Sequence, residues 1–129
     1  PIPFGWGGAG KPRAVNDSGK AAENMAAHYL QRQGLKLLES NYRCRFGEID
    51  LVMRDGKETV FVEVRLRGNA AFGGAAASIT RSKQEKLTRT AQYYQMLHGQ
   101  TACRFDAVLL DGLDEHRLEW IRNAFDAAG

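Results

Sequence analysis

The sequence predicts an α/β domain in which a mixed β-sheet is flanked by helices. Three observations support this prediction: a helical apolar period near the amino terminus, a β-hairpin pattern in the middle, and a second helical period followed by a buried strand. The chain has 129 residues, which suits one domain. In the order helix, three strands, helix and strand, the strand after the second helix is expected to run parallel to a hairpin strand through a right-handed crossover.

Composition excludes several classes of protein. Hydrophobic residues make up 43% and charged residues 26%, which is unlike disordered or collagen-like chains. The apolar runs are too short to cross a bilayer, so no membrane association is expected. Pro1 to Gly10 have no basic leader followed by an apolar core, so the expected location is cytoplasmic. A net charge of +3 is compatible with a phosphate-bearing partner without requiring one.

The first residues are interpreted as an arm and a helix. Residues 1–16 are rich in Gly and Pro and predict a flexible amino-terminal arm, which leaves 17–129 as a single domain. Asn16, Asp17 and Ser18 offer capping side chains, and apolar residues then recur at helical spacing until Gly34. A helix is therefore expected over about 18–33.

Three strands should follow. A first strand is predicted from Leu35 to Tyr42, although its alternation is imperfect. Residues 47–53 and 58–67 form a clearer pair, since the Asp55-Gly56 step between them is a strong hairpin-turn signal.

The second half of the chain adds a helix and further strands. Residues 68–77 are small and Gly-rich and suit either a loop that closes over a ligand or a plain connection. Ser82 and Glu85 match a capping box for a helix over 80–98. Residues 104–111 predict a buried strand, and residues 118–125 are compatible with a strand or a helix. The thiols of Cys44 and Cys103, far apart in sequence, are expected to be free.

The hairpin separates apolar from charged side chains. With Asp55-Gly56 as the turn, Asp50 should oppose Phe61, and Glu48 should oppose Glu63. One face then carries the apolar residues Ile49, Leu51, Met53, Val60, Val62, Val64 and Leu66. The other carries Glu48, Asp50, Phe61, Glu63, Arg65 and Arg67.

Two of these acids predict a metal site. Asp50 is the diagonal neighbour of Glu63, about 7–8 Å away at the backbone, so their carboxylates can converge on one cation. Mg²⁺ or Mn²⁺ prefers such oxygen ligands and would support phosphodiester hydrolysis. The alternative is a solvated face on which the acids pair with Arg65 and Arg67. Phe61 on the same face favours a covered site.

A basic stripe is expected on the second helix. Lys83, Lys86 and Arg89 are spaced by three residues and should lie on one side, where they could contact a phosphate backbone. A solvated helix face explains them equally well. In the last buried strand, Asp106 is expected to be a scaffold partner of Arg104, Lys83 or another basic group.

These motifs carry a family resemblance. Gly47-Glu48-Ile49-Asp50-Leu51-Val52, Phe61-Val62-Glu63-Val64-Arg65 and Arg104-Phe105-Asp106, with Gly19 and Glu23 upstream, resemble the YraN-like family of small bacterial proteins over about residues 18–126. That family is similar to Holliday junction resolvases and the PD-(D/E)xK nucleases. The resemblance implies a restriction-endonuclease-like three-layer sandwich, DNA as partner and a homodimer.

The resemblance also implies roles for individual residues. Glu23 would be the helix carboxylate, and Asp50 and Glu63 the metal ligands of a catalytic set completed by Arg65. Arg65 stands at the lysine position of the pattern, and arginine cannot act as a general base. The sequence therefore predicts a Mg²⁺-dependent endonuclease acting on structured or branched DNA. Its rivals are a non-catalytic nucleic-acid-binding module and a protein-interaction scaffold.

Overall fold

The computed structural model describes residues 14–67 and 79–126. The elements are α1 (Ala14–Arg32), β1 (Lys36–Cys44), β2 (Gly47–Asp55), β3 (Glu58–Arg67), α2 (Arg81–His98), β4 (Cys103–Asp111), the short 3-10 helix η2 (Glu115–Arg117) and β5 (Leu118–Phe125). Residues 118–125, for which the sequence allowed either a strand or a helix, therefore form a strand. The Gly-rich stretch 68–77 and most of the predicted arm, 1–13, lie outside the described residues.

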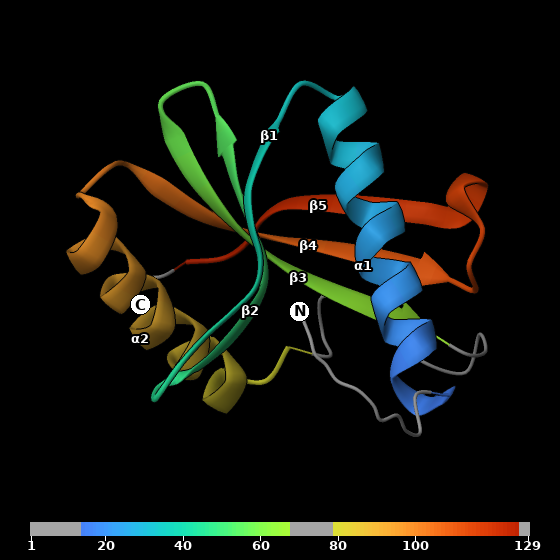
Figure 1. Cartoon of the computed structure of the whole chain (residues 1–129), viewed down its shortest axis with the longest axis horizontal. Coiled ribbons are helices and arrows are strands. Elements are labelled where there is room, and N and C mark those ends of the chain that lie inside the picture. The colour runs from blue at the N-terminus through green and yellow to red at the C-terminus, as the bar shows by residue number, and fades with distance from the viewer. Residues whose placement is uncertain (1–13, 68–78, 127–129) are drawn as a thin grey trace, which may run out of the picture.

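The five strands form one mixed sheet in the order β1-β2-β3-β4-β5. β3 and β4 are parallel, and the other neighbours are antiparallel. The predicted parallel pairing between a hairpin strand and the strand after the second helix is therefore confirmed. α1 and α2 lie on opposite sides of the sheet (Figure 1), which gives the expected α/β sandwich of the restriction-endonuclease-like kind.

Both faces of the sheet are buried. Against α1 lie Leu51, Met53, Val60, Val62 and Val108, packed on Ala26, Ala27 and Leu30. Against α2 lie Val52, Phe61, Phe105 and Leu109, packed on Leu87, Ala91 and Tyr94. Ile49 belongs to the α2 cluster, not to the face of Leu51 as predicted. The alternation changes here because β2 pairs with β3 only from Leu51 onward, while Ile49 pairs with Tyr42 of β1.

The hairpin register differs from the predicted one by two residues. Val52, not Asp50, pairs with Phe61, and Asp55 pairs with Glu58 across the turn residues Gly56 and Lys57. Gly56 has a φ of +64°, in the left-handed region that favours glycine. Because side chains alternate with a period of two, this shift leaves the residues of the paired part, from Leu51 onward in β2, on the side they were assigned.

The helix starts also differ from those predicted. α1 begins at Ala14, so the cap residues expected at 16–18 lie within it. α2 is capped by Thr80, whose side chain accepts a hydrogen bond from the Lys83 N–H, and not by Ser82. Ile79, just before this cap, is buried in the α2 cluster and anchors the start of the helix.

Asp106 on β4 is the centre of a buried polar network. Its carboxylate accepts hydrogen bonds from Arg104 Nε at 3.0 and 3.2 Å, from Trp120 Nε1 at 3.0 Å and from the Asn123 N–H at 3.0 Å. The network fixes β5 against β4, and Asp106 is the scaffold partner of Arg104 that the sequence predicts.

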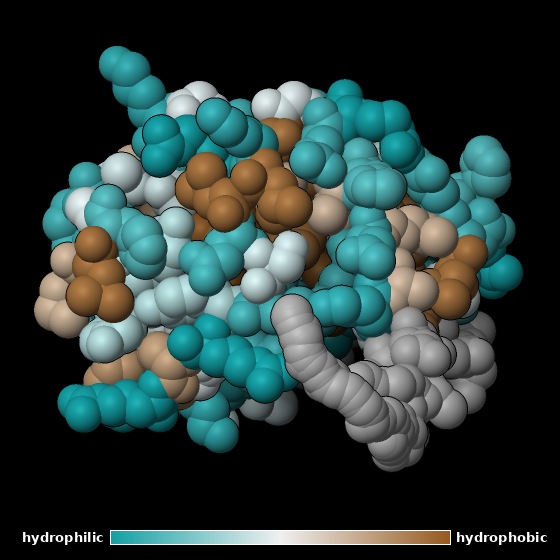
Figure 2. All heavy atoms as spheres, viewed as in Figure 1, coloured by the Kyte–Doolittle hydropathy of each residue, from teal (hydrophilic) through white to brown (hydrophobic). Residues whose placement is uncertain are grey.

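Several remaining expectations concern the whole molecule. Cys44 and Cys103 are free thiols, as expected. None of the helices in the described ranges is long and apolar enough to cross a membrane. Figure 2 shows a face on which hydrophilic side chains predominate and apolar ones form small separate patches.

Candidate functional site

Asp50 lies at the point where β2 separates from β3. The ladder between these strands ends at the pair Leu51 and Val62, and Asp50 Oδ2 accepts a hydrogen bond of 2.8 Å from the backbone N–H of Val64. The carboxylate thus takes a donor that a continuing ladder would have used. This bond holds the Asp50 side chain against β3, beside the residue that precedes Val64.

That residue is Glu63, whose side chain is only 8% exposed. Its Oε2 atom lies 3.1 Å from Arg65 Nε on the same strand and 3.7 Å from Lys83 Nζ in the first turn of α2. A buried carboxylate requires such partners, because the desolvation of an uncompensated charge is costly. The structure therefore assembles one carboxylate and two cations from two elements that are far apart in sequence.

Asp50 is a buried acid surrounded by other acids. Within residues 14–67 and 79–126, no ion pair involves Asp50. Burial, followed by the negative charges of Glu63, Glu23 and Glu48, raises the pKa of its carboxyl to about 7 against the lowering effect of the Val64 hydrogen bond. These acids are thus close enough to act on one another, and negative charge is concentrated at the split between β2 and β3.

Glu23 and Glu48 lie at the margin of this group. Glu23 is half-buried on α1, so it approaches Asp50 from the face opposite α2. Glu48 is also half-buried, and its Oε2 atom lies 3.6 Å from Arg43 Nε on β1. Asp50 and Glu63 thus lie beside one another on β2 and β3, and Glu23 on α1 acts on Asp50 only through its charge.

The three basic residues predicted to share one side of α2 have different surroundings. Lys83 is paired with Glu63. Lys86 is exposed, and its Cβ atom and carbonyl oxygen lie close to Gly47 at the start of β2. Arg89 is exposed and lines two hollows on the surface of α2. The sequence placed Lys83 with the phosphate-binding set, and helical spacing alone could not indicate its contact with a strand residue.

The carboxylate oxygens at this site suit a divalent ion that is also bound by the substrate. Asp50 and Glu63 offer hard oxygen ligands, and a cation between them would relieve the repulsion that raises the pKa of Asp50. Among the described residues, no group of three or more His, Cys, Asp or Glu side chains is arranged to hold a metal ion by itself. Mg²⁺ commonly takes one or two carboxylates and completes its shell with water and phosphate oxygens.

Comparison with known proteins gives one consistent result. The model of the uncharacterised protein family UPF0102 matches residues 22–110. A UPF0102 protein of Nitrosomonas europaea is 59% identical over 114 residues, which cover 88% of this chain and 97% of the relative. UPF0102 proteins of Methylobacillus flagellatus and Alkalilimnicola ehrlichii are 55% and 50% identical over 84% and 88% of this chain, and over 96% and 90% of their own lengths.

Proposed function

The chain belongs to UPF0102, an uncharacterised protein family, and we propose that it is a divalent-metal-dependent endonuclease that cleaves structured or branched DNA. The observation that carries the proposal is the pairing of Asp50 with Glu63 where β2 leaves β3. Two carboxylates are kept together there although burial and mutual repulsion raise the pKa of Asp50 to about 7. Such a costly arrangement favours a function that uses both charges.

Asp50 and Glu63 would hold the metal ion, Mg²⁺ or Mn²⁺. When bound, the ion supplies Lewis-acid polarisation of a phosphoryl oxygen and a more acidic water. Hydrolysis would add a water molecule across one P–O bond of the phosphodiester and leave a phosphate on one end of the nucleic-acid strand and a hydroxyl on the other. The hydrogen bond from the Val64 N–H fixes the orientation of the Asp50 carboxylate during this step.

Lys83 and Arg65 supply positive charge at the same place. Both contact Glu63, so either can reach a phosphate or a water bound next to that carboxylate. Lysine carries a compact charge with three donors, whereas arginine presents a planar fork. We propose that Lys83 orients the attacking water and that Arg65 stabilises the charge that develops on the phosphoryl oxygens. Glu23 would bind a water of the metal shell from the α1 side.

A second function is a nucleic-acid-binding module without catalysis. It is favoured by the position of Arg65, whose Nε lies 3.1 Å from Glu63 and could neutralise that acid without a metal. In this case Lys83, Lys86 and Arg89 would contact phosphates, and binding would be independent of divalent ions.

Cleavage of labelled DNA tests the two functions. Single-stranded, duplex and four-way-junction substrates are incubated with Mg²⁺ or Mn²⁺ and with the wild type, Asp50→Asn or Glu63→Gln. Glu119→Gln, an exposed acid on β5, is the matched control and should behave as the wild type. Metal-dependent products that disappear in both site variants support the nuclease. Salt-sensitive binding that survives in both variants, without cleavage, supports the binding module instead.

A further inference from the structure

A hollow lies between the β1–β2 turn and α2. It measures about 430 Å³ and is lined by Arg45, Phe46, Arg89, Gln92, Tyr93 and Met96. The turn comes this close because Gly47 has no side chain: a Cβ there would lie 3.0 Å from Thr90 Oγ1, at a φ of +153°. The fold thus presses the turn onto the helix and brings Phe46 to Tyr93.

The hollow contains an aromatic platform. The Phe46 and Tyr93 rings are 5.7 Å apart between centroids with an interplanar angle of 60°, and both side chains are half-buried. The guanidinium carbon of Arg45 lies 5.1 Å from the centroid of the Phe46 ring. Met96, with 64% of its surface exposed, adds apolar surface at the edge. Flat aromatic faces that remain partly open can stack on a nucleobase of any sequence.

Positive charge surrounds this platform. Arg45 and Arg89 are both exposed, and within the described ranges neither takes part in an ion pair. Guanidinium groups bind phosphate through paired hydrogen bonds and also stack on bases. Rings flanked by unneutralised arginines match a nucleotide, which presents a flat base and an anion together.

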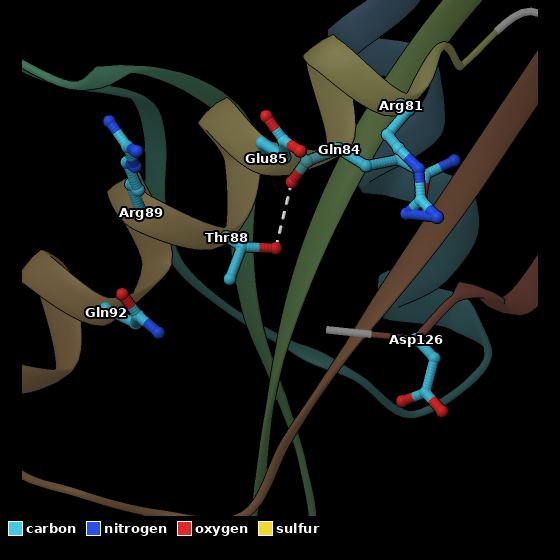
Figure 3. A pocket seen from close by; sticks show the side chains of 7 residues that line it. All are labelled: Arg81, Gln84, Glu85, Thr88, Arg89, Gln92 and Asp126. Atoms are coloured by element: carbon cyan, nitrogen blue, oxygen red, sulfur yellow. Dashed lines mark hydrogen bonds between the residues drawn. The ribbon is translucent and has the colours of Figure 1, made fainter. Parts of the chain in front are cut away.

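A second hollow on α2 does not have this character. In Figure 3 the carboxylate of Glu85 lies between Arg81 and Arg89 along the helix, and Asp126 lies on the side of Arg81. Two acids there oppose an anionic ligand, and its lining contains no aromatic ring. The observations therefore favour the hollow at Phe46 and Tyr93.

The platform is placed to act with the site at Asp50 and Glu63. Lys83 of α2 contacts Glu63, and Tyr93 follows ten residues later, which is about 15 Å along a helix. Lys86 lies between them, beside Gly47. A nucleic-acid strand that follows this side of α2 would contact the cation of Lys83, then the cation of Lys86, and then the rings of Phe46 and Tyr93.

We propose that this hollow binds an unpaired base of a single-stranded nucleic-acid segment, with the flanking phosphates on Arg45 and Arg89. The inference rests on the proposed function, because it names the class of substrate: a molecule that presents unpaired nucleotides next to the bond to be cleaved. A fully paired duplex keeps its bases stacked inside and cannot fill the platform.

Binding measured without metal tests this inference separately from cleavage. Fluorescence anisotropy in EDTA compares a labelled oligo-dT, an oligo-U and a blunt duplex on the full chain. Tyr93→Leu and Phe46→Leu remove the rings but keep apolar volume, and Arg45→Gln changes an exposed position that should not affect folding. Leu97→Ala is the control, because Leu97 is an exposed apolar residue of α2 outside the lining.

We expect the ring variants to lose about tenfold or more in affinity for both single strands and less than about twofold for the duplex. Arg45→Gln should weaken single-strand binding and lower its salt dependence, and Leu97→Ala should change nothing. Unchanged single-strand affinity in Arg45→Gln and in correctly folded ring variants would overturn the platform, while metal-dependent cleavage could still stand. Failure of both single strands to bind in EDTA would also overturn the platform, whereas the proposed function is decided by the metal-dependent cleavage assay.

Discussion

Asp50 Oδ2 accepts a 2.8 Å hydrogen bond from the backbone N–H of Val64, so a side chain of β2 replaces the strand partner that β3 loses there. This contact explains how two acids stay together. Once β2 and β3 separate, there is room between them for carboxylate oxygens, and the hydrogen bond offsets part of the burial cost of Asp50. The opening of the hairpin and the acidic site are therefore one structural feature.

Asp50→Asn is expected to stabilise the fold, and more so at high pH. The native pKa of Asp50 is about 7, against an ordinary value of 3.8, so the native state holds more protons than the unfolded state between these values. The free energy of unfolding of the wild type should therefore fall as the pH rises through this window. Asparagine keeps an acceptor for the Val64 N–H and removes the titration.

Urea unfolding in EDTA at pH 5 and pH 8 measures this effect. The stabilisation by Asp50→Asn should be larger at pH 8 by about 1–2 kcal/mol, after allowance for partial solvation. Glu119→Gln should show no such dependence. An equal effect of Asp50→Asn at both pH values would contradict a raised pKa.

Divalent ions should raise the melting temperature, with a larger effect at pH 8 than at pH 6. A cation and a proton compete for Asp50, so metal affinity should increase as the carboxyl ionises around pH 7. Ca²⁺ serves as the probe because it takes the same oxygen ligands without supporting efficient cleavage in many Mg²⁺ sites. We expect a shift of several degrees at saturating Ca²⁺.

Differential scanning fluorimetry with a Ca²⁺ titration provides the measurement. The shift should disappear in Asp50→Asn and Glu63→Gln and persist in Glu119→Gln. A shift of equal size in all four proteins would place the ion elsewhere and remove the basis for a metal at these acids.

The arrangement of the hairpin was predictable because side-chain alternation tolerates an error of two residues. The error in register did not separate Asp50 from Glu63, because the ladder ends at Leu51 and Val62, the residues directly beside them. The separation of β2 from β3 was not predictable, because it depends on the Asp50 side chain reaching the Val64 N–H. Ile49 was assigned to the wrong cluster for the same reason.

Helical periodicity could not predict the contact of Lys83 with Glu63. Spacing shows which residues share a side of α2, but the strand residue they meet depends on how the helix docks on the sheet. That docking is fixed by the buried side chains of Ile79, Leu87, Ala91 and Tyr94. The helix start depends on the same packing, since Thr80 and Ser82 are both good caps and burial of Ile79 selects Thr80.

Lys83→Ala should lower cleavage much more than Lys86→Ala. Lys83 Nζ lies 3.7 Å from Glu63 Oε2, whereas Lys86 is exposed on the same helix and should act only through phosphate attraction. In single-turnover assays we expect Lys83→Ala to reduce the maximal rate by tenfold or more, in the range of a lost acid–base or electrostatic group. Lys86→Ala should raise KM and leave kcat nearly unchanged.

Arg65→Lys complements this pair of variants. A lysine at position 65 keeps a positive charge beside Glu63, so activity should be retained or increased. If Lys83→Ala and Lys86→Ala have the same effect on kcat, Lys83 is one phosphate contact among several. If Arg65→Lys alone abolishes cleavage, the guanidinium geometry is what the reaction requires.

Asp106→Ala should destabilise the fold strongly without changing the chemistry of folded molecules. The Asp106 side chain is fully buried, and its removal leaves Arg104 Nε, Trp120 Nε1 and the Asn123 N–H without their acceptor. Arg104 keeps its ion pairs with Asp55 and Glu58, so the cost comes from the lost buried hydrogen bonds, about 1–3 kcal/mol for each unsatisfied group. Asp111→Ala on the same strand breaks only the exposed pair with Arg117 and should cost less than about 1 kcal/mol. Urea unfolding separates the two variants, and a cost below about 1 kcal/mol for Asp106→Ala would show that β5 is held by its backbone ladder and not by this carboxylate.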